Sequence, residues 1–243
     1  MPARFYVDSP FCIGQTLVLP EKTAHHASRV LRMREGDEAA LFDGKGREAD
    51  VVLHFFADRT EAEIVNVRAC QTESPLKTVL IQALVSQEKL DWILEKATEL
   101  GVTEIIIAPS ERSVTRLDAK RLAKRLEQWN KTVQAACEQC QRGVFASVYY
   151  KPNLKEAFES VRSELKIILA PGANACLDFQ NYRSIAFAVG PEGGFSAEEI
   201  RLAQEHGFLC RLMGPRVLRT ETAGLAALAV AQWQAGDFQR NAI

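Results

Sequence analysis

The chain has 243 residues, of which 47% are hydrophobic and 25% are charged, and its formal net charge is −1. These proportions are ordinary for soluble globular proteins, and they exclude intrinsic disorder and collagen-like architecture. No apolar run reaches the roughly 18–20 residues that a transmembrane helix needs, and the N-terminal segment turns polar at Asp8, which leaves no room for a signal-peptide core. We therefore expect a cytoplasmic protein of one or two domains.

The six cysteines do not indicate a disulfide framework in a chain of this length. Cys137 and Cys140 form a C-x-x-C pattern, but no second such pair and no histidine pair accompanies it. The pattern also lies late in a helical segment rather than after a strand. Structural cysteines on a helix are favoured over a redox or metal pair, and no metal site is predicted.

The N-terminal third of the sequence is rich in short β-forming runs. Asp43 and Gly44 mark a tight turn, because glycine supplies the positive φ that such turns require. Closely spaced short strands predict a small β-barrel over residues 1–72, and the polar stretch that ends at Pro75 links it to a second domain over residues 73–243. The expected strands are 4–7, 16–19, 38–42, 48–56 and 60–67, and one helix is expected at 23–31.

Strand-like and helical patterns alternate in the rest of the chain. This alternation predicts an α/β fold, in which helices cover both faces of a parallel sheet. The expected strands are 78–85, 103–108, 145–150, 166–170, 185–189 and 209–213, and the expected helices are 88–100, 118–142, 154–161, 197–206 and 220–234.

A glycine-rich turn follows the strand at 185–189. It contains Gly190, Gly193 and Gly194, and a helix follows whose start is marked by a capping box of Ser196 and Glu199. Glycines let backbone amides approach a ligand closely, and open α/β sheets bind ligands at the carboxyl ends of their strands. Because no Gly-Lys-Ser/Thr follows, the turn is not a P-loop. It predicts a cofactor held mainly by backbone groups, and a simple tight turn is the alternative.

A second turn follows the strand at 209–213. It contains a Gly-Pro pair at Gly214, and a helix of small residues begins near Thr220. Arg216 and Arg219 flank two apolar residues in this turn. Arginines in such a place can hold a phosphate or a developing anion, and two solvated arginines at a helix start are the alternative.

Two segments are basic although the whole chain is nearly neutral. Residues 22–34 contain four Lys or Arg and two His with no acid, and residues 110–131 contain seven Lys or Arg against three acids. Such patches indicate local binding of phosphate groups. Solvated helix faces are the alternative.

The two turns resemble, in their residue order, the SPOUT class of RNA methyltransferases. More narrowly, the chain is similar to the RsmE family, which methylates N3 of a uridine in 16S ribosomal RNA. The resemblance covers essentially the whole chain, with one departure at Cys140, where the family more often has serine. The segments that carry it are 190–196 (GPEGGFS) and 213–223 (MGPRVLRTETA), and 4–7, 26–37, 95–102, 112–113 and 138–142 support it.

The resemblance implies a deep trefoil knot in the C-terminal domain, an exception to the rule that chains do not thread loops. It also implies a PUA-like, RNA-binding N-terminal barrel and a homodimer with the site near the subunit interface. S-adenosylmethionine is the implied cofactor, and 16S ribosomal RNA within the small ribosomal subunit is the implied partner. The expected cofactor-binding residues are Leu169, Ala170, Gly190, Glu192, Gly193, Gly194, Met213, Gly214, Leu218, Thr222 and Ala223.

Methylation at uridine N3 removes a proton and spreads negative charge onto the flanking carbonyl oxygens, so a general base and a cation both help. A carboxylate with an ordinary pKa of about 4.3 is a poor base for such a weak acid, and the base is therefore left unassigned. Glu138 and Arg142 can alternatively pair with each other at i,i+4 on a helix. The candidate bases are Glu138 and Glu221, and the candidate cations are Arg112, Arg142 and Arg219.

Contacts to RNA phosphates give affinity but little sequence choice, so the choice of site must come largely from RNA shape. Two alternatives to the main interpretation stay open: a SPOUT methyltransferase that acts on a different RNA or position, such as transfer RNA or a ribose 2′-oxygen, and a non-catalytic RNA-binding ribosome assembly factor. The expected phosphate contacts are Arg4, Arg29, Arg32, Arg34, Arg116, Lys120 and Lys124.

Overall fold

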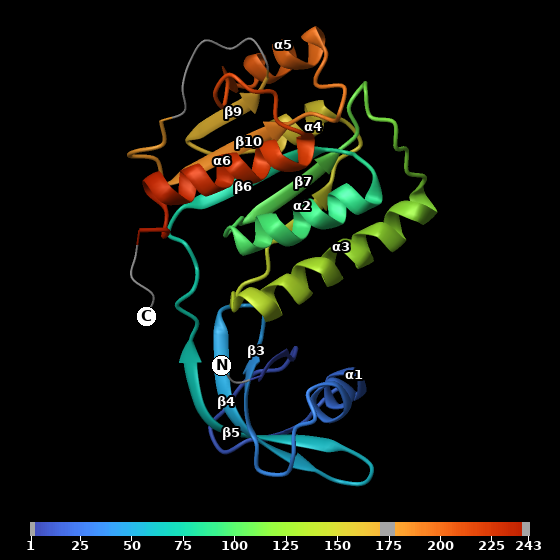
Figure 1. The fold of residues 1–243 in the computed structure, drawn as a ribbon, viewed down its shortest axis with the longest axis vertical. Coiled ribbons are helices and arrows are strands. Elements are labelled where there is room, and N and C mark those ends of the chain that lie inside the picture. The colour runs from blue at the N-terminus through green and yellow to red at the C-terminus, as the bar shows by residue number, and fades with distance from the viewer. Residues whose placement is uncertain (1–2, 171–177, 240–243) are drawn as a thin grey trace. The chain divides into compact units, whose positions relative to one another are not determined.

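The computed structural model describes residues 3–170 and 178–239, which form two compact units (Figure 1). One unit contains the residues up to Glu73 together with Gln134–Phe145, and the other contains Ser74–Val133 and the residues from Ala146 onwards. The N-terminal unit thus takes in the last turns of a helix from the second half of the sequence. The domain boundary between residues 72 and 73 stays a prediction.

The N-terminal unit is a five-stranded sheet with one short helix. Along β4, Ala49, Val51 and Leu53 alternate inward with more exposed neighbours, as the two-residue period of a strand requires. These side chains pack with Phe5 and Phe11 in a shared core. The strands are β1 (Ala3–Tyr6), β2 (Thr16–Val18), β3 (Glu38–Phe42), β4 (Arg47–Phe55) and β5 (Thr60–Ala69), in the order β1-β3-β4-β5-β2.

The β3–β4 turn explains why residues 134–145 belong to this unit. Asp43 Oδ1 accepts hydrogen bonds from the backbone N–H groups of Lys45 (2.7 Å) and Arg47 (3.0 Å), which closes the predicted tight turn. The backbone of the same turn exchanges hydrogen bonds with Gly143 and Phe145. The predicted helix at 23–31 is present as α1 (Glu21–His25) followed by a π-helical turn (His26–Val30).

The second unit is a six-stranded sheet in which every pairing is parallel. Its strand order is β11-β9-β10-β6-β7-β8, so that β9 and β10 lie between β11 and β6. The α/β class predicted from the sequence is confirmed, while the knot stays a prediction. The strands are β6 (Lys77–Ala83), β7 (Glu104–Ala108), β8 (Ser147–Tyr150), β9 (Leu165–Leu169), β10 (Ser184–Val189) and β11 (Leu209–Arg211).

Helices cover both faces of this sheet (Figure 1). Ile81 of β6 and Ala188 of β10 point toward α4 and α5, whereas Leu80 and Val189 point toward α6. A Cβ atom on Gly224 of α6 would lie only 3.0 Å from Leu80 Cδ1, so this glycine lets the helix lie close to the sheet. The helices are α2 (Gln87–Glu99), α3 (Ala119–Cys140), α4 (Leu154–Ser160), α5 (Ala197–Glu205) and α6 (Thr220–Ala235).

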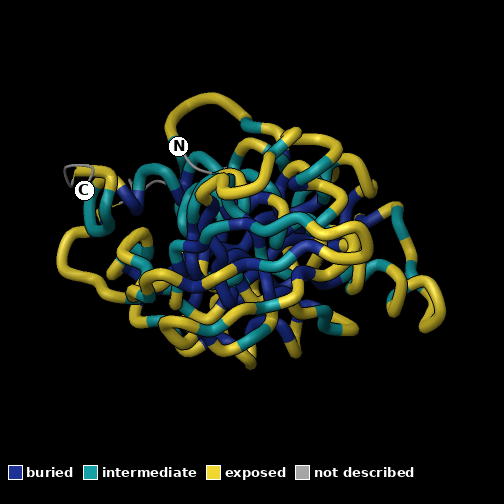
Figure 2. Tube along the Cα trace, turned by 90° about the horizontal axis from the view of Figure 1, so that it is seen from below, coloured by how far each residue is buried: buried dark blue, intermediate teal, exposed yellow. Residues whose placement is uncertain are grey.

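The strands and helices predicted from the sequence all occur, with ends shifted by at most two residues. Buried stretches of the chain lie toward the inside, and exposed stretches lie on the outer bends of the trace (Figure 2). Within the described residues, no helix combines the length and the apolar character that crossing a membrane requires. Five of the six cysteines fall in the described ranges, where all five are free thiols; Cys176 lies outside them.

Candidate active site

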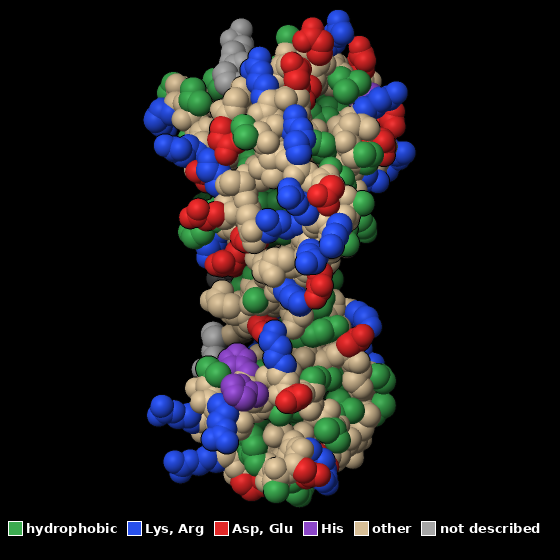
Figure 3. All heavy atoms as spheres, turned by 90° about the vertical axis from the view of Figure 1, so that its right-hand side faces the viewer, with side chains coloured by type: hydrophobic (Ala, Val, Ile, Leu, Met, Phe, Trp, Pro, Cys, Tyr) green, Lys and Arg blue, Asp and Glu red, His purple; other side chains and the backbone are tan. Residues whose placement is uncertain are grey.

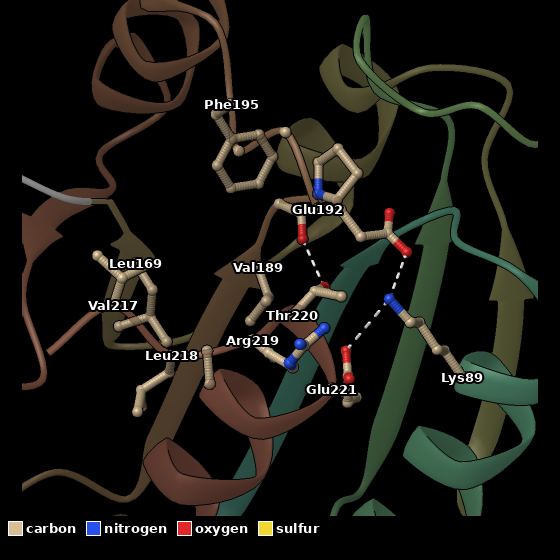
Figure 4. A pocket seen from close by; sticks show the side chains of 15 residues that line it. Lys89, Leu169, Val189, Glu192, Phe195, Val217, Leu218, Arg219, Thr220 and Glu221 are labelled. Carbon is tan, nitrogen blue, oxygen red and sulfur yellow. Dashed lines mark hydrogen bonds and ion pairs between the residues drawn. The ribbon is translucent and has the colours of Figure 1, made fainter.

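A cavity of about 430 Å³ lies at the carboxyl edge of the parallel sheet (Figure 4). Because all six strands run in one direction, the residues that follow β9, β10 and β11 meet at this edge, where open α/β sheets bind ligands. A second cavity of about 200 Å³ shares four of the lining residues. The lining residues of the first cavity are Lys89, Leu169, Val189, Gly190, Pro191, Glu192, Gly193, Gly194, Phe195, Val217, Leu218, Arg219, Thr220, Glu221 and Ala223.

The turn after β10 needs its glycines for distinct reasons. A Cβ atom on Gly190 would lie 3.0 Å from the backbone nitrogen of Phe195, so the turn closes on itself too tightly for any side chain there. Gly194 has a φ of +68°, which L-residues rarely adopt. The predicted capping box is confirmed: Ser196 N–H donates to Glu199 Oε2 (2.8 Å), and Glu199 N–H donates to Ser196 Oγ (3.3 Å).

Thr220, at the start of α6, joins the two glycine-bearing turns. Its Oγ1 hydroxyl donates a hydrogen bond of 2.6 Å to the carbonyl oxygen of Gly190, and it accepts one of 3.0 Å from Nε2 of Gln82 on β6. Both polar side chains are buried. The two turns that the sequence marked as ligand-binding therefore lie side by side and line one cavity.

A third loop, which follows β7, is attached to the same edge. Arg112 Nη1 donates a hydrogen bond of 2.8 Å to the carbonyl oxygen of Gly193. Glu199 accepts hydrogen bonds from Ser110 Oγ (3.1 Å) and from the backbone N–H of Glu111 (2.8 Å). The exposed Arg112 is thus held against the glycine turn.

Lys89 is a cavity residue that the sequence analysis did not single out. Its Nζ lies 2.7 Å from Glu192 Oε1 and 3.7 Å from Glu221 Oε2. The hydrogen bond to Glu192 raises the pKa of Lys89, and the same bond lowers the pKa of Glu192. Its position in the sequence could have identified it as a site residue. Lys89 lies in the first turn of α2, directly after the strand-to-helix connection at the carboxyl end of β6.

Most of the expected cofactor-binding residues line one of the two cavities. Gly214 and Thr222 are not among the lining residues within the described part of the chain. Gly214 lies in the second turn with a φ of +77°, and Thr222 is exposed on α6. The residues that line a cavity are Leu169, Ala170, Gly190, Glu192, Gly193, Gly194, Met213, Leu218 and Ala223.

Comparison with known proteins agrees with this geometry. Residues 72–232 match the model of an RNA methyltransferase domain, and residues 19–53 match that of an RNA methyltransferase PUA domain. The ribosomal RNA small subunit methyltransferase E of Bacillus subtilis is 30% identical over 232 residues, which cover 90% of each chain. The chain belongs to the ribosomal RNA small subunit methyltransferase E family.

Two further members of this family are similar to the chain over almost its whole length. The methyltransferase E of Synechocystis is 31% identical over 237 residues, which cover 94% of this chain and 77% of that one. The methyltransferase E of Neisseria gonorrhoeae was crystallised with S-adenosylmethionine bound. It is 40% identical and superposes with a TM-score of 0.91 over 98% of this chain and 100% of its own. The likeness to this family therefore extends over both units.

The structure places two of the candidate catalytic residues in the N-terminal unit. Arg142 is 5% exposed, and its Nη2 lies 2.8 Å from Oε2 of Glu73. Glu138 Oε1 accepts hydrogen bonds from the backbone of Tyr6 (3.3 Å) and from Nε2 of Gln134 (3.1 Å). Arg112, Arg219 and Glu221 belong to the unit that carries the cavity. Glu138 thus contacts β1 through Tyr6, and Arg142, just after α3, pairs with the segment that follows β5.

Arg4 does not fit its expected role as a phosphate contact, because it is enclosed by its own unit. Its side chain is 7% exposed and lies 3.4 Å from Glu48. Its guanidinium group donates to the carbonyl oxygens of Cys137 (2.9 Å) and Arg142 (3.0 Å) and stacks over the ring of Phe42. Arg4 therefore has a structural role that the sequence pattern did not reveal.

The other expected phosphate contacts are exposed. Arg29 lies in the π-helical turn, and Arg32 and Arg34 follow it; Lys22 and His25, on the preceding α1, are also exposed. Lysine, arginine and histidine side chains gather on this face of the N-terminal unit (Figure 3). In the second unit, two cations lie four residues apart on the first turns of α3 and therefore share one face of the helix, and a third lies in the segment just before α3. These are Arg116, Lys120 and Lys124, and all three are exposed.

Proposed function

We propose that this protein transfers the methyl group of S-adenosylmethionine to N3 of a uridine in 16S ribosomal RNA within the small ribosomal subunit. The observation that carries the proposal is the hydrogen bond from Thr220 to Gly190, which brings both glycine-bearing turns to one cavity. The bound S-adenosylmethionine in the Neisseria gonorrhoeae member supports the choice of cofactor.

The cavity fits such a cofactor. Its volume lies within the range of small-molecule sites, which is roughly 300–1,000 Å³. Leu169, Val217 and Leu218 present apolar surface for the adenosine rings, and the glycine turn presents backbone rather than side chains. At Gly193 a Cβ atom would lie 3.3 Å from the Arg112 side chain, so the turn leaves little room for any larger residue.

The cofactor supplies an already activated methyl group, so the protein mainly has to position the reactants. We assign stabilisation of the uracil anion and removal of its proton to Arg219 and Glu221, because both residues line the cavity. The guanidinium of Arg219 stabilises the negative charge that develops on the uracil oxygens. Because a carboxylate is a poor base for N3, stabilisation of the anion by Arg219 matters more in this proposal than the base does. Glu221 is the candidate base that lines the cavity, and Arg112 adds positive charge at the glycine turn.

The RNA binds through phosphate contacts on each unit. Arg29, Arg32 and Arg34 supply them in the N-terminal unit, and the exposed Arg116, Lys120 and Lys124 supply them in the second. Such contacts give affinity and salt dependence without reading the sequence. Recognition of one uridine therefore depends on RNA shape, as the ribosomal subunit presents it.

The protein acts as a homodimer in this proposal. Helix α6 is rich in apolar side chains, and such a helix is normally buried on all sides. Nevertheless Trp233 is 59% exposed, and Trp92 on the neighbouring α2 is 52% exposed. A second copy of the chain covers this surface. Light scattering of Trp233→Glu checks it, since a dimer that persists at low protein concentration would contradict the assignment.

The decisive experiment incubates purified small ribosomal subunits with the enzyme and labelled S-adenosylmethionine, followed by mass spectrometry of nucleosides. Labelled 3-methyluridine in 16S ribosomal RNA is the expected product. Label on a ribose oxygen or in transfer RNA would favour another RNA methyltransferase activity. Cofactor binding without any transfer would favour a non-catalytic assembly factor.

A further inference from the structure

The cavity of the second unit has an apolar end and a charged end. Leu169, Val217 and Leu218 lie at one side of the cavity, and Lys89 and Glu192 lie at the opposite side (Figure 4). The apolar side continues into the adjoining cavity of about 200 Å³, which the same three residues also line. A ligand that fills this space therefore needs one apolar part and one charged part.

The charged end contains both positively and negatively charged side chains, and these come from different elements. Lys89 lies on α2, Glu192 in the turn after β10, and Glu221 in the first turn of α6, with Arg219 just before it. The Lys89 side chain is 27% exposed and that of Glu192 is 46% exposed. Ion pairs exposed to this degree contribute little stability on their own, so the pair can open to accept a ligand.

We propose that Lys89 and Glu192 form the subsite for a zwitterionic α-amino acid group, the methionine tail of the cofactor. Lys89 receives the carboxylate of this tail and Glu192 receives its ammonium group. The inference rests on the proposed function, and it assigns binding roles within the cavity that the two glycine-bearing turns line.

The distribution of charge argues against a ligand group of a single sign. A phosphate would approach Lys89 and Arg219 but would be repelled by Glu192 and Glu221, and a simple cation would meet the opposite difficulty. A group that carries both charges gains an ion pair at each end. Such charge-assisted hydrogen bonds are about twice as strong as neutral ones.

Two adenosine compounds that differ only in the tail test the proposal by calorimetry. S-adenosylhomocysteine carries the amino acid group, whereas 5′-methylthioadenosine lacks it. Each of Lys89→Met and Glu192→Gln is expected to weaken binding of S-adenosylhomocysteine about 10- to 100-fold, the effect of losing one hydrogen bond to a charged group. Binding of 5′-methylthioadenosine is expected to stay unchanged, which also shows that each variant folds.

Lys96→Met is the matched control. Lys96 lies on the same helix with the same side-chain exposure of 27%, and it pairs with Glu95 and Glu99 outside the cavity. This variant should leave both affinities unchanged.

Three results would overturn the subsite. Equal losses for both compounds would mean that the pair only holds the loops in place. Unchanged binding of S-adenosylhomocysteine, with weaker methylation of RNA, would assign the charged end to the target base. Failure of the unaltered protein to bind S-adenosylhomocysteine would contradict the proposed function itself, and the subsite with it.

Discussion

Thr220 donates a hydrogen bond of 2.6 Å from its hydroxyl to the carbonyl oxygen of Gly190, thirty residues earlier in the chain. The hydroxyl also accepts a bond from the fully buried Gln82. One side chain thus connects the start of α6, the turn after β10 and the central strand β6. The geometry of the cavity depends on this connection.

Thr220→Val tests the connection, because it removes both hydrogen bonds and keeps the side-chain shape. The buried Gly190 carbonyl and the Gln82 amide lose a partner, and each unsatisfied group costs roughly 1–3 kcal/mol. We expect a lower free energy of unfolding in urea and weaker binding of S-adenosylmethionine by calorimetry. Thr16→Val, at an exposed position on β2 of the N-terminal unit, should change neither. Stability and affinity at wild-type levels in Thr220→Val would refute the role.

Substitution of Gly193 by residues of increasing size tests whether the glycine turn binds the cofactor. A Cβ atom at this position would lie 3.3 Å from Arg112 Cβ, so alanine requires a small shift and valine a larger one. We expect Gly193→Ala to weaken S-adenosylmethionine binding and Gly193→Val to abolish it, while the N-terminal unit stays folded. Calorimetry measures the affinity, and a Gly193→Val protein that binds the cofactor normally would exclude this turn from the site.

Arg142→Met distinguishes a structural from a catalytic role for this arginine. Arg142 is nearly buried, whereas the side chain of its partner Glu73 is 28% exposed. Losing this hydrogen bond between charged groups predicts a loss of stability of about 1.5–3 kcal/mol. Glu73→Gln should also destabilise the protein, because it leaves the Arg142 charge in the same buried place. Denaturant unfolding of both variants checks this. If Arg142→Met unfolds like the wild type but methylates RNA slowly, the structural assignment is wrong.

Arg32→Glu tests the basic surface of the N-terminal unit. Each lost phosphate contact should weaken RNA binding and lower the dependence of the logarithm of affinity on the logarithm of salt concentration by about one unit. Affinity for S-adenosylmethionine should not change. Arg59→Gln is the control, because Arg59 already pairs with Asp58 and Glu61. Equal salt slopes for wild type and Arg32→Glu would remove Arg32 from the RNA contacts.

His54 provides a pH-dependent contact in the N-terminal sheet. Hydrogen bonds to Glu35 (2.6 Å) and Glu63 (3.4 Å) raise its pKa above the ordinary value of 6.5. A raised folded-state pKa means that the contact stabilises the protein below pH 6.5 and that this stabilisation is lost as the pH rises through the folded-state pKa. NMR titration should show the raised pKa, and Glu35→Gln should lower it. An identical titration in that variant would contradict the assigned cause.

Local signals in the sequence predicted the fold and the edge of the sheet that carries the cavity. The alternation of strands and helices, the capping box at Ser196 and the glycines at Gly190 and Gly194 each depend on neighbouring residues, so one sequence is enough to find them. The family resemblance then supplied the knot, the dimer and the residue roles, which stay predictions.

Partners that are distant in the chain could not be found in this way. Arg4 looked like a phosphate contact because nothing near it in the sequence indicates that Glu48 and the end of α3 enclose it. Arg142 pairs with Glu73, which is 69 residues away. Lys89 was missed because its two carboxylate partners come from turns more than 100 residues later.

Glu199 caps its own helix and also binds the loop that follows β7. One carboxylate group accepts hydrogen bonds from Ser196, from Ser110 and from the backbone of Glu111. The loop after β7 that carries Arg112 and the turn that carries Gly193 are therefore held to each other by hydrogen bonds. A ligand that binds against this turn therefore contacts a guanidinium group that these hydrogen bonds already hold beside it.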